Sequence, residues 1–173
     1  MSARPKILIR QDAIYDAIDR IAEEIRRDYR GRNPLMIGIL KGSFIFMADL
    51  VRCINIKLEI DFIRLSSYGS GTQSSGEIKV KTKLTEKVRG RHVIIVEDII
   101  DTGLTTAFLI DFLTKQGAAS VKLCALTEKP ARRKIDVCID YLGFSIPDKF
   151  IIGYGIDWDE KYRYLPDICY IES

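Results

Sequence analysis

The sequence has little histidine and little cysteine, the residues on which many catalytic and metal sites depend. Its 173 residues include one histidine, His92, so a metal site with two histidine ligands is excluded. A Ser-His-Asp triad would have to use His92, and a structural histidine at the start of a strand is the simpler interpretation. The cysteines form no C-x-x-C pair, which argues against a zinc site or a disulfide framework, so we expect reduced thiols in a cytoplasmic protein. They are Cys53, Cys124, Cys138 and Cys169.

Long apolar runs and a charge of one sign are also missing. No apolar stretch reaches the length of about 18 residues that a transmembrane helix needs. The opening decapeptide, MSARPKILIR, lacks the apolar segment of a signal peptide, so neither a membrane span nor secretion is predicted. Lys and Arg number 27 against 24 Asp and Glu, and the net charge of +3 is too small to indicate a nucleic-acid partner.

From residue 35 onward, apolar strand-like segments alternate with helical ones, a pattern typical of a parallel sheet flanked by helices. Residues 11–29 precede this series and carry isoleucines at spacings of three and four, which predicts an amphipathic helix. No linker or repeat divides the chain, so we predict one α/β domain. The further helices are expected at 44–51 and 104–117, and the strands at 35–40, 58–65, 77–84, 92–98, 121–129, 137–144 and 150–157.

Two segments have distinctive local patterns. Alternation in 58–65 places Leu58, Ile60 and Phe62 on one face of the expected strand. Residues 66–76, SSYGSGTQSSG, are the low-complexity segment of the chain and predict a mobile loop.

Residues 96–108, VEDIIDTGLTTAF, gather three acids where a buried strand ends. Ligands of parallel α/β sheets bind at the carboxyl ends of the strands, and Glu97 and Asp98 lie at such an end. Two carboxylates can accept hydrogen bonds from a sugar diol, and a magnesium ion can offset their charge. The next helix begins with free backbone N–H groups and threonine hydroxyls, which suit a phosphate, and Gly103 lets the backbone approach it.

A helix cap is the competing interpretation of this stretch. A cap alone accounts for Asp101 and Thr102 without any ligand. It does not account for the adjacent acids Glu97 and Asp98, which no cap requires. A Walker A loop is excluded because the G-x-x-x-x-G-K-[ST] pattern is absent.

The pattern of two apolar residues, two acids, two further residues and then Asp-Thr-Gly-x-Thr resembles the phosphoribosyl-diphosphate (PRPP) signature of type I phosphoribosyltransferases. VEDIIDTG is similar to the form in the hypoxanthine-guanine branch of that family. GILKGSFIFMADL (38–50) resembles its pyrophosphate loop, SYGSGTQSSG (67–76) its flexible catalytic loop, and PDKFIIGYGIDWDEKYRYLPDI (147–168) its purine-site segment. The resemblance implies a parallel sheet flanked by helices, with a core at residues 35–140 and a small hood formed by the N-terminal segment and residues 141–173.

The resemblance also implies roles for the acidic loop. Glu97 and Asp98 bind the ribose hydroxyls directly or through Mg²⁺, and Asp101 is the general base that accepts the purine N7 proton. Some relatives have lysine where this chain has Leu104, so only the backbone of Leu104 is expected to contribute. The residues that surround the 5′-phosphate are Thr102, Gly103, Leu104, Thr105 and Thr106.

Pyrophosphate and metal contacts follow from the same resemblance. Lys41 and Gly42 bind pyrophosphate after a peptide bond from Leu40 that is often cis in the family. Arg163 binds it as well, and Asp157 holds a second Mg²⁺. The implied metal ligands are therefore Glu97, Asp98 and Asp157.

The remaining implied contacts involve the mobile loop and the base. Ser67 and Tyr68 close over the diphosphate. Lys129 donates to the O6 atom of a 6-oxopurine. Phe150 stacks on the base, and Ile151 contacts it through its backbone. Trp158 either lines this pocket or packs in the core. The residues implied to bind the base are therefore Lys129, Phe150, Ile151 and Asp157.

The implied activity is transfer of the phosphoribosyl group from PRPP to hypoxanthine, guanine or also xanthine, with Mg²⁺, in a homodimer or homotetramer. A transferase for another base is one alternative, but such relatives usually differ in the acid pair or lack the PDKFIIGYGID segment. A regulator that senses PRPP and binds RNA or DNA without turnover is the other. Such regulators tend to lack the general base or the loop, so the presence of Asp101 and residues 67–76 favours the enzyme.

Overall fold

The computed structural model describes residues 4–67 and 78–172. Their helices and strands follow the predicted alternation, with short strands added near both ends of the chain. In chain order the elements are β1 (Lys6–Ile9), α1 (Gln11–Asp28), β2 (Leu35–Leu40), α2 (Phe44–Ile54), β3 (Glu59–Ser67), β4 (Ile78–Val80), β5 (His92–Ile100), α3 (Leu104–Lys115), β6 (Ser120–Glu128), the 3₁₀ helix η1 (Pro130–Arg132), β7 (Tyr141–Ser145), β8 (Ile151–Ile152) and β9 (Ile168–Tyr170).

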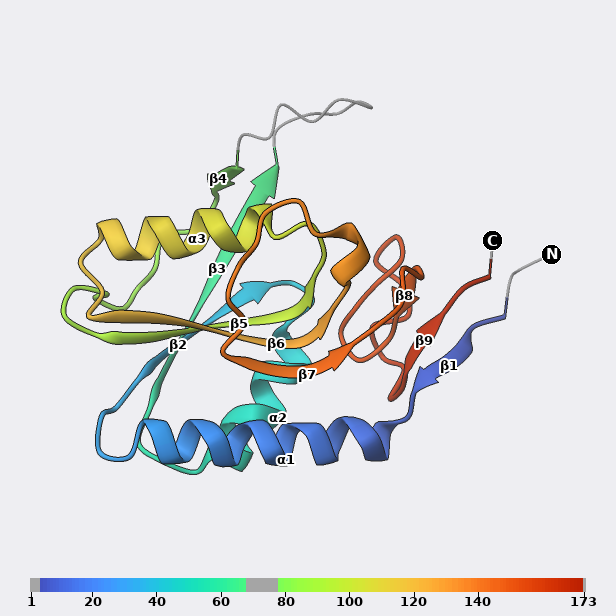
Figure 1. Ribbon diagram of the computed structural model, residues 1–173, viewed down its shortest axis with the longest axis horizontal. Coiled ribbons are helices and arrows are strands. Elements are labelled where there is room, and N and C mark those ends of the chain that lie inside the picture. Colours follow the sequence, from blue (N-terminus) through green and yellow to red (C-terminus); the bar gives the residue numbers. More distant parts are fainter. Residues whose placement is uncertain (1–3, 68–77, 173) are drawn as a thin grey trace.

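Within the described residues, the main sheet has six strands in the order β4-β3-β2-β5-β6-β7 (Figure 1). Its strands pair in parallel except for β4, which adds antiparallel to β3 at the edge. Continuous apolar runs such as LMIGIL of β2 suit parallel strands that are covered on both faces. The predicted parallel sheet flanked by helices is confirmed.

Two apolar cores lie on opposite faces of this sheet, because side chains alternate along each strand. In β5, Ile94 and Val96 pack with α1 and α2, whereas Val93 and Ile95 pack with α3. Figure 1 shows α1 and α2 on one side of the strands and α3 on the other. The isoleucines that the helical spacing of α1 identified are all buried; they are Ile14, Ile18, Ile21 and Ile25.

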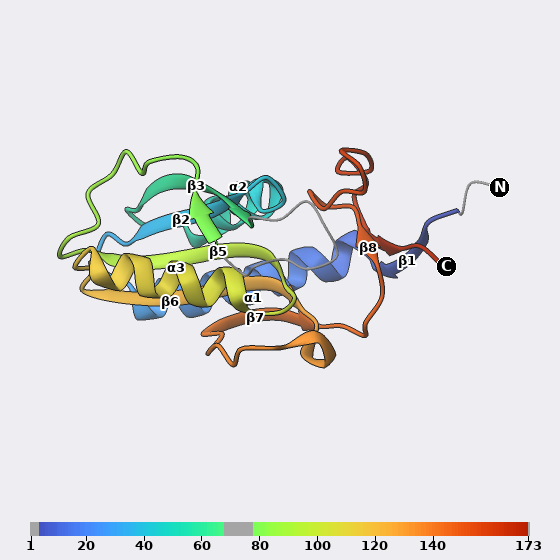
Figure 2. The ribbon, with the colours of Figure 1, turned by 90° about the horizontal axis from the view of Figure 1, so that it is seen from above.

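A second sheet of three antiparallel strands, in the order β1-β9-β8, lies beyond the carboxyl ends of the parallel strands (Figures 1 and 2). It joins segments far apart in the sequence, since Ile7 of β1 stands opposite Cys169 of β9. We call this sheet and the turns after β8 the hood. The buried Tyr154 of the hood donates its hydroxyl to Asp49 of α2, which ties the hood to the main domain.

Some predicted boundaries are wrong for local reasons. The strand expected at 137–144 begins at Tyr141, because Asp140 makes a turn in which its N–H donates to Leu123 O (2.9 Å) and its carboxylate accepts the Leu123 N–H (2.9 Å). The strand expected at 150–157 ends at Ile152, because Gly153 and Gly155 take φ values of 95° and 96° and turn the chain. The ribbon expected at 77–84 is reduced to β4.

The face of β3 that carries Leu58, Ile60 and Phe62 is not uniformly buried. Ile60 is 48% exposed, whereas Ile63 on the opposite face is completely buried. Phe62 packs against the core beneath α1 and α2, and Ile63 belongs to the core beneath α3. Alternation therefore located the strand, but a strand covered on both faces has no single apolar side.

The four cysteines are free thiols, as predicted, with Cys124 and Cys169 buried and Cys138 exposed. Across residues 4–67 and 78–172, no helix combines the length and the apolar character needed to cross a bilayer.

One carboxylate holds the connection between β4 and β5. Asp61 of β3 accepts the N–H groups of Thr85 (2.7 Å) and Glu86 (3.0 Å) and the Thr85 hydroxyl (3.2 Å). Burial acts to raise the pKa of Asp61, but these hydrogen bonds and that from the Phe62 N–H outweigh it, so the pKa is lowered.

Replacement of Asp61 with Asn should destabilise the protein by about 1–3 kcal/mol at neutral pH, because an amide nitrogen cannot accept these donors. The pKa of Asp61 is lower in the folded than in the unfolded state. The unfolded state therefore takes up the proton first as the pH falls, and the contribution of Asp61 is lost below about pH 4. Urea unfolding at pH 7 and pH 3 measures this, with the exposed Asp16→Asn as control. An equal parent–variant difference at both pH values would contradict the prediction.

Candidate active site

The acidic loop, residues 97–106, connects β5 to α3 at the carboxyl end of the main sheet. Glu97 and Asp98 lie within β5 rather than after it, because the pairing of β5 with β6 continues to Ile100. Gly103 takes a φ of 82° and turns the chain into α3. The first helical turn leaves backbone N–H groups without partners inside the helix, and they border the loop. The loop therefore joins two acids to an anion-binding helix start.

Glu97 has a buried carboxyl group that lacks a complete set of partners. Its side chain is 8% exposed, and its Oε2 atom has no hydrogen-bond donor among the described residues. Burial, reinforced by the charge of Asp98, raises the pKa of Glu97 well above its ordinary value. A buried carboxylate of this kind is costly unless a proton, a cation or a ligand hydroxyl satisfies it.

Asp98 lies against the loop that follows β2. A Cβ atom at Gly42 would stand 1.9 Å from Asp98 Oδ2, so only glycine leaves room for this carboxylate. Burial raises the pKa of Asp98 to about 6. The backbone N–H of Ile99 and the Arg163 guanidinium lower this pKa, and the charge of Asp157 raises it.

Arg163 forms ion pairs with two acids of the purine-site segment. Its Nη2 atom lies 2.8 Å from Asp157 Oδ1 and 3.2 Å from Glu160 Oε2, and its Nη1 donates to Gly155 O (2.8 Å). Lys41 Nζ lies 2.8 Å from Glu160 Oε1. The two cations predicted to bind pyrophosphate, Lys41 and Arg163, therefore meet through Glu160.

The loop after β2 and the hood touch through backbone atoms. A Cβ atom at Gly155 would stand 2.3 Å from Gly42 O, which only glycine permits. The peptide bond between Leu40 and Lys41 is cis, as the resemblance implied. The contact between Gly155 and Gly42 positions Lys41 beside the segment that carries Arg163.

Residues 129–135, which we call the 129–135 arm, follow β6 and lie against the acidic loop. The Lys129 N–H donates to Ile100 O (2.9 Å), and the N–H groups of Lys134 and Ile135 both donate to Thr102 O (2.9 and 3.1 Å). A Cβ atom at Gly103 would stand 2.5 Å from Ile135 O. Lys129 is 7% exposed, and its ammonium forms no ion pair within the described residues.

Asp101, the predicted general base, faces the same arm. Its Oδ1 atom lies 2.8 Å from Arg132 Nε, although the two are not aligned as a hydrogen bond. Arg132 Nη1 also lies 3.7 Å from Asp148 Oδ1. Asp101 is therefore an ion-pair partner rather than a helix cap, because the N-cap of α3 is Gly103, with no side-chain cap hydrogen bond.

Aromatic side chains gather in the hood. Phe150 meets Trp158 edge to face, with centroids 6.0 Å apart, and Trp158 stacks on Tyr162 at 6.4 Å. Phe150 is 53% and Trp158 48% exposed, so the core-packing alternative for Trp158 is wrong. Ile151, in β8, is buried in the core, and its side chain is not available to a ligand.

The predicted contacts of Ser67 and Tyr68 with the diphosphate are not described, because Tyr68 and the side chain of Ser67 lie outside the described residues. Asp157 is paired with Arg163 in the ligand-free protein, and its charge acts on Asp98. Within residues 4–67 and 78–172, no group of three or more His, Cys, Asp and Glu side chains could hold a metal ion by itself. The individual roles stay predictions.

Residues 7–159 match the family model described as a phosphoribosyl transferase domain. The chain belongs to this family. The hypoxanthine-guanine phosphoribosyltransferase of Streptococcus pneumoniae (strain R6) is 47% identical over 94% of this chain and 91% of its own length. The bifunctional protein TilS/HprT of Listeria monocytogenes is 46% identical over 94% of this chain, which spans only 25% of that protein.

Solved structures agree with the fold of this phosphoribosyltransferase. A hypoxanthine-guanine phosphoribosyltransferase of Bacillus anthracis, crystallised with HEPES in its active site, has a TM-score of 0.93 at 43% identity and covers 99% of this chain and 100% of its own. A hypoxanthine phosphoribosyltransferase of Staphylococcus aureus has a TM-score of 0.92 at 37% identity, over 96% and 91% of the two chains. The sheet flanked by helices that the resemblance implied is therefore confirmed. The hood bound expected at residue 141 is wrong, because β7 (Tyr141–Ser145) is an edge strand of the main sheet.

Sequence reasoning missed two residues of this phosphoribosyltransferase site, Glu160 and Arg132. Each lies in a charged stretch beside a residue that was identified, WDEKYR for Glu160 and EKPARRK for Arg132. The many charged residues next to Asp157 and Lys129 could have indicated that Glu160 and Arg132 belong to the same site. The pairing of these charges depends on contacts between distant segments and could not be read from spacing.

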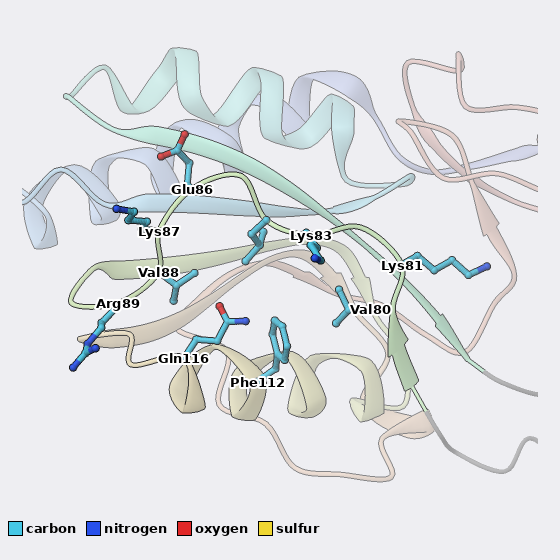
Figure 3. A pocket seen from close by; sticks show the side chains of 10 residues that line it. Val80, Lys81, Lys83, Glu86, Lys87, Val88, Arg89, Phe112 and Gln116 are labelled. Carbon is cyan, nitrogen blue, oxygen red and sulfur yellow. The ribbon is translucent and has the colours of Figure 1, made fainter.

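A cleft of about 840 Å³ lies elsewhere in the phosphoribosyltransferase. It is lined by residues between Val80 and Arg89, by Phe112 of α3 and by Gln116, which directly follows that helix (Figure 3). None of its lining residues belongs to the acidic loop, the 129–135 arm or the hood. Glu86 is the single acid among its lining residues, whereas the acidic loop carries three acids, so the acidic loop is the candidate active site.

Replacement of Asp98 with Asn should stabilise the substrate-free phosphoribosyltransferase by about 1–3 kcal/mol at pH 7. The pKa of Asp98 is raised to about 6, so the folded state holds a proton that the unfolded state releases at lower pH. Stability should therefore fall as the pH rises from about 4 to 6, and the amide removes this fall. Denaturant unfolding at pH 4.5 and pH 7 measures it, with the exposed Asp136→Asn as control. A variant no more stable than its parent at pH 7 would refute the prediction.

Proposed function

We propose that this chain is a hypoxanthine-guanine phosphoribosyltransferase of purine salvage. It transfers the phosphoribosyl group of PRPP to hypoxanthine or guanine, with xanthine as a further candidate, and releases IMP or GMP with pyrophosphate. The name and length of the Streptococcus pneumoniae relative support this, because the chain spans 91% of that protein. The activity of the longer Listeria monocytogenes protein is not carried over, because the chain spans only 25% of it.

The observation that carries the proposal is the unsatisfied carboxylate of Glu97 at the end of the sheet. It stands beside a second, half-buried acid, Asp98, and both precede the free N–H groups where α3 begins. A ribose 5-phosphate offers hydroxyls to the acids and a phosphate to the helix start, so one ligand satisfies both. The phosphate contacts are assigned to the residues Thr102 to Thr106.

The diphosphate end of PRPP meets Lys41, Gly42 and Arg163. Charge builds on pyrophosphate as it leaves, and cations fixed at that end stabilise the transition state. Glu160 pairs with both Lys41 and Arg163 in the ligand-free protein. The diphosphate therefore replaces Glu160 as their anionic partner when it binds.

Magnesium fits the acids of this site. Glu97 Oε2 is unpaired and the pKa of Asp98 is raised, so both carboxyls favour a neighbouring cation. Mg²⁺ is usually held by one or two carboxylates together with substrate phosphates and water, so a cage made only of protein groups is not needed. Glu97 and Asp98 would hold the ion, and Asp157 would support a second one. When bound, such ions would offset the negative charge of PRPP.

The base lies between the 129–135 arm and the hood. Lys129 is buried without an ionic partner among the described residues and donates to the O6 atom of the purine. The exposed ring of Phe150 stacks on the base, and the backbone of Ile151 contacts it. A donor at O6 selects 6-oxopurines over adenine, whose 6-amino group is itself a donor. Asp101 accepts the N7 proton.

Three further features complete the proposal. Ser67 and Tyr68 cover the diphosphate during turnover and keep water from the ribosyl cation. The enzyme acts in the cytoplasm, as its free thiols suit. It assembles as a homodimer or homotetramer, which sedimentation of the purified protein measures directly.

Incubation with PRPP and Mg²⁺ should convert hypoxanthine and guanine to nucleotides, whereas adenine and uracil should give at least about 100-fold less product, because the site is built around an O6 acceptor. Nucleotide formation is followed by absorbance and chromatography. Chelation of Mg²⁺ with EDTA should abolish turnover, and added Mg²⁺ should restore it. No product from either 6-oxopurine would overturn the proposed function.

Two single variants should separate binding from chemistry. Asp101→Asn should lower kcat by about 10²–10⁴-fold with little change in PRPP affinity, because general base catalysis is lost. Glu97→Ala should instead weaken PRPP binding by about tenfold or more, because the ribose and Mg²⁺ lose a carboxylate. Calorimetry gives the affinities and initial rates give kcat, with the exposed Asp136→Asn as control. Full activity of Asp101→Asn would remove it from the role of base.

A further inference from the structure

Arg132 connects three segments around the proposed base. It ends η1, three residues after Lys129. Its Nε lies 2.8 Å from Asp101 Oδ1, and its Nη1 lies 3.7 Å from Asp148 Oδ1. Asp148 precedes Phe150 by two residues. One guanidinium thus links the acidic loop, the 129–135 arm and the segment that carries the proposed stacking ring.

The two oxygens of Asp101 are in different surroundings. Oδ1 is buried, although the side chain as a whole is 40% exposed. The exposed part of the side chain therefore lies in its other atoms. With Oδ1 turned toward Arg132, Oδ2 is the oxygen that remains for a proton from a ligand. A carboxylate held at one oxygen keeps the other in a fixed direction.

Arg132 itself is held in place by the arm. Its N–H donates to Lys129 O (3.1 Å), and the Arg133 N–H donates to Pro130 O (3.2 Å). The side chain of Arg133 pairs with Glu128 at 2.6 Å, with both side chains largely buried. The arm is also bonded to Thr102 O at its far end. The backbone that carries the Arg132 guanidinium is therefore fixed by hydrogen bonds.

We propose that Arg132 is a positioning residue for the transferase reaction. It holds Asp101 through Oδ1, so that Oδ2 points toward the purine N7, and it acts only through Asp101. This inference rests on the proposed function. A fixed base keeps its productive geometry in every encounter with substrate, and loss of that geometry lowers turnover without loss of the PRPP contacts.

Three variants test the role of Arg132. Arg132→Gln should lower kcat by about tenfold or more and leave the KM for PRPP within about twofold, because a misplaced base slows only the chemical step. Arg132→Lys keeps the charge and should recover most of the loss. Arg20→Gln is the matched control, because Arg20 is 51% exposed against 48% for Arg132, also forms an ion pair, and lies on α1 away from the site. Initial rates with hypoxanthine give both constants, and thermal unfolding is recorded for each protein.

A double-mutant cycle separates positioning from a structural role. If Arg132 acts through Asp101, Arg132→Gln should have almost no further effect on kcat once Asp101 is Asn. An equal loss of kcat in both backgrounds would assign Arg132 to stability of the arm and overturn the inference. If Arg132→Gln does not fold, the smaller loss caused by Arg132→Lys must vanish in the same way.

The activity of the parent protein distinguishes failure of the proposed function from failure of the positioning role of Arg132. An active parent with an equally active Arg132→Gln variant overturns the positioning role and leaves the proposed function in place. An inactive parent overturns the proposed function and this inference with it.

Discussion

The carboxyl group of Glu97 is buried at the end of the main sheet with an oxygen that no described residue satisfies, and the half-buried Asp98 follows it directly in β5. Two acids in this position oppose folding unless their surroundings compensate. The fold supplies that compensation only in part, through backbone N–H groups and the more distant charge of Arg163. The proposed binding of a cation and of ribose hydroxyls at this site would supply the partners that these carboxyl groups lack.

The charges around these acids are arranged as pairs that a ligand can exchange. Glu160 holds Lys41 and Arg163 while no diphosphate is present, and Arg132 holds one oxygen of Asp101. Such pairs keep long cationic side chains near their working positions, at the small net stability that exposed ion pairs usually give. The substrate-free protein is thus preorganised for anions while each cation remains neutralised.

Much of this architecture was predictable from local patterns. The apolar run of β5 and the isoleucine spacing of α1 each indicated their element, but β5 continues past its acids to Ile100, because its pairing with β6 continues that far. The hood was not predictable in the same way, because β8 and β9 are only two and three residues long and exist through pairing of distant segments. The resemblance identified Lys41 and Arg163, but not Glu160, which joins them. Spacing records periodicity within an element, whereas ion pairs across elements depend on how those elements pack.

Gly155 and Gly42 meet with no side chain between them, and each position excludes even a methyl group. At this point the hood is seated on the loop after β2 by main-chain atoms, and the ion pair between Lys41 and Glu160 adds a side-chain contact nearby. Changes of the aromatic side chains at Phe150, Trp158 or Tyr162 leave that joint untouched, since none of them takes part in it. The preference for one base over another can therefore drift between descendants of this chain while the machinery that handles the diphosphate keeps the same geometry.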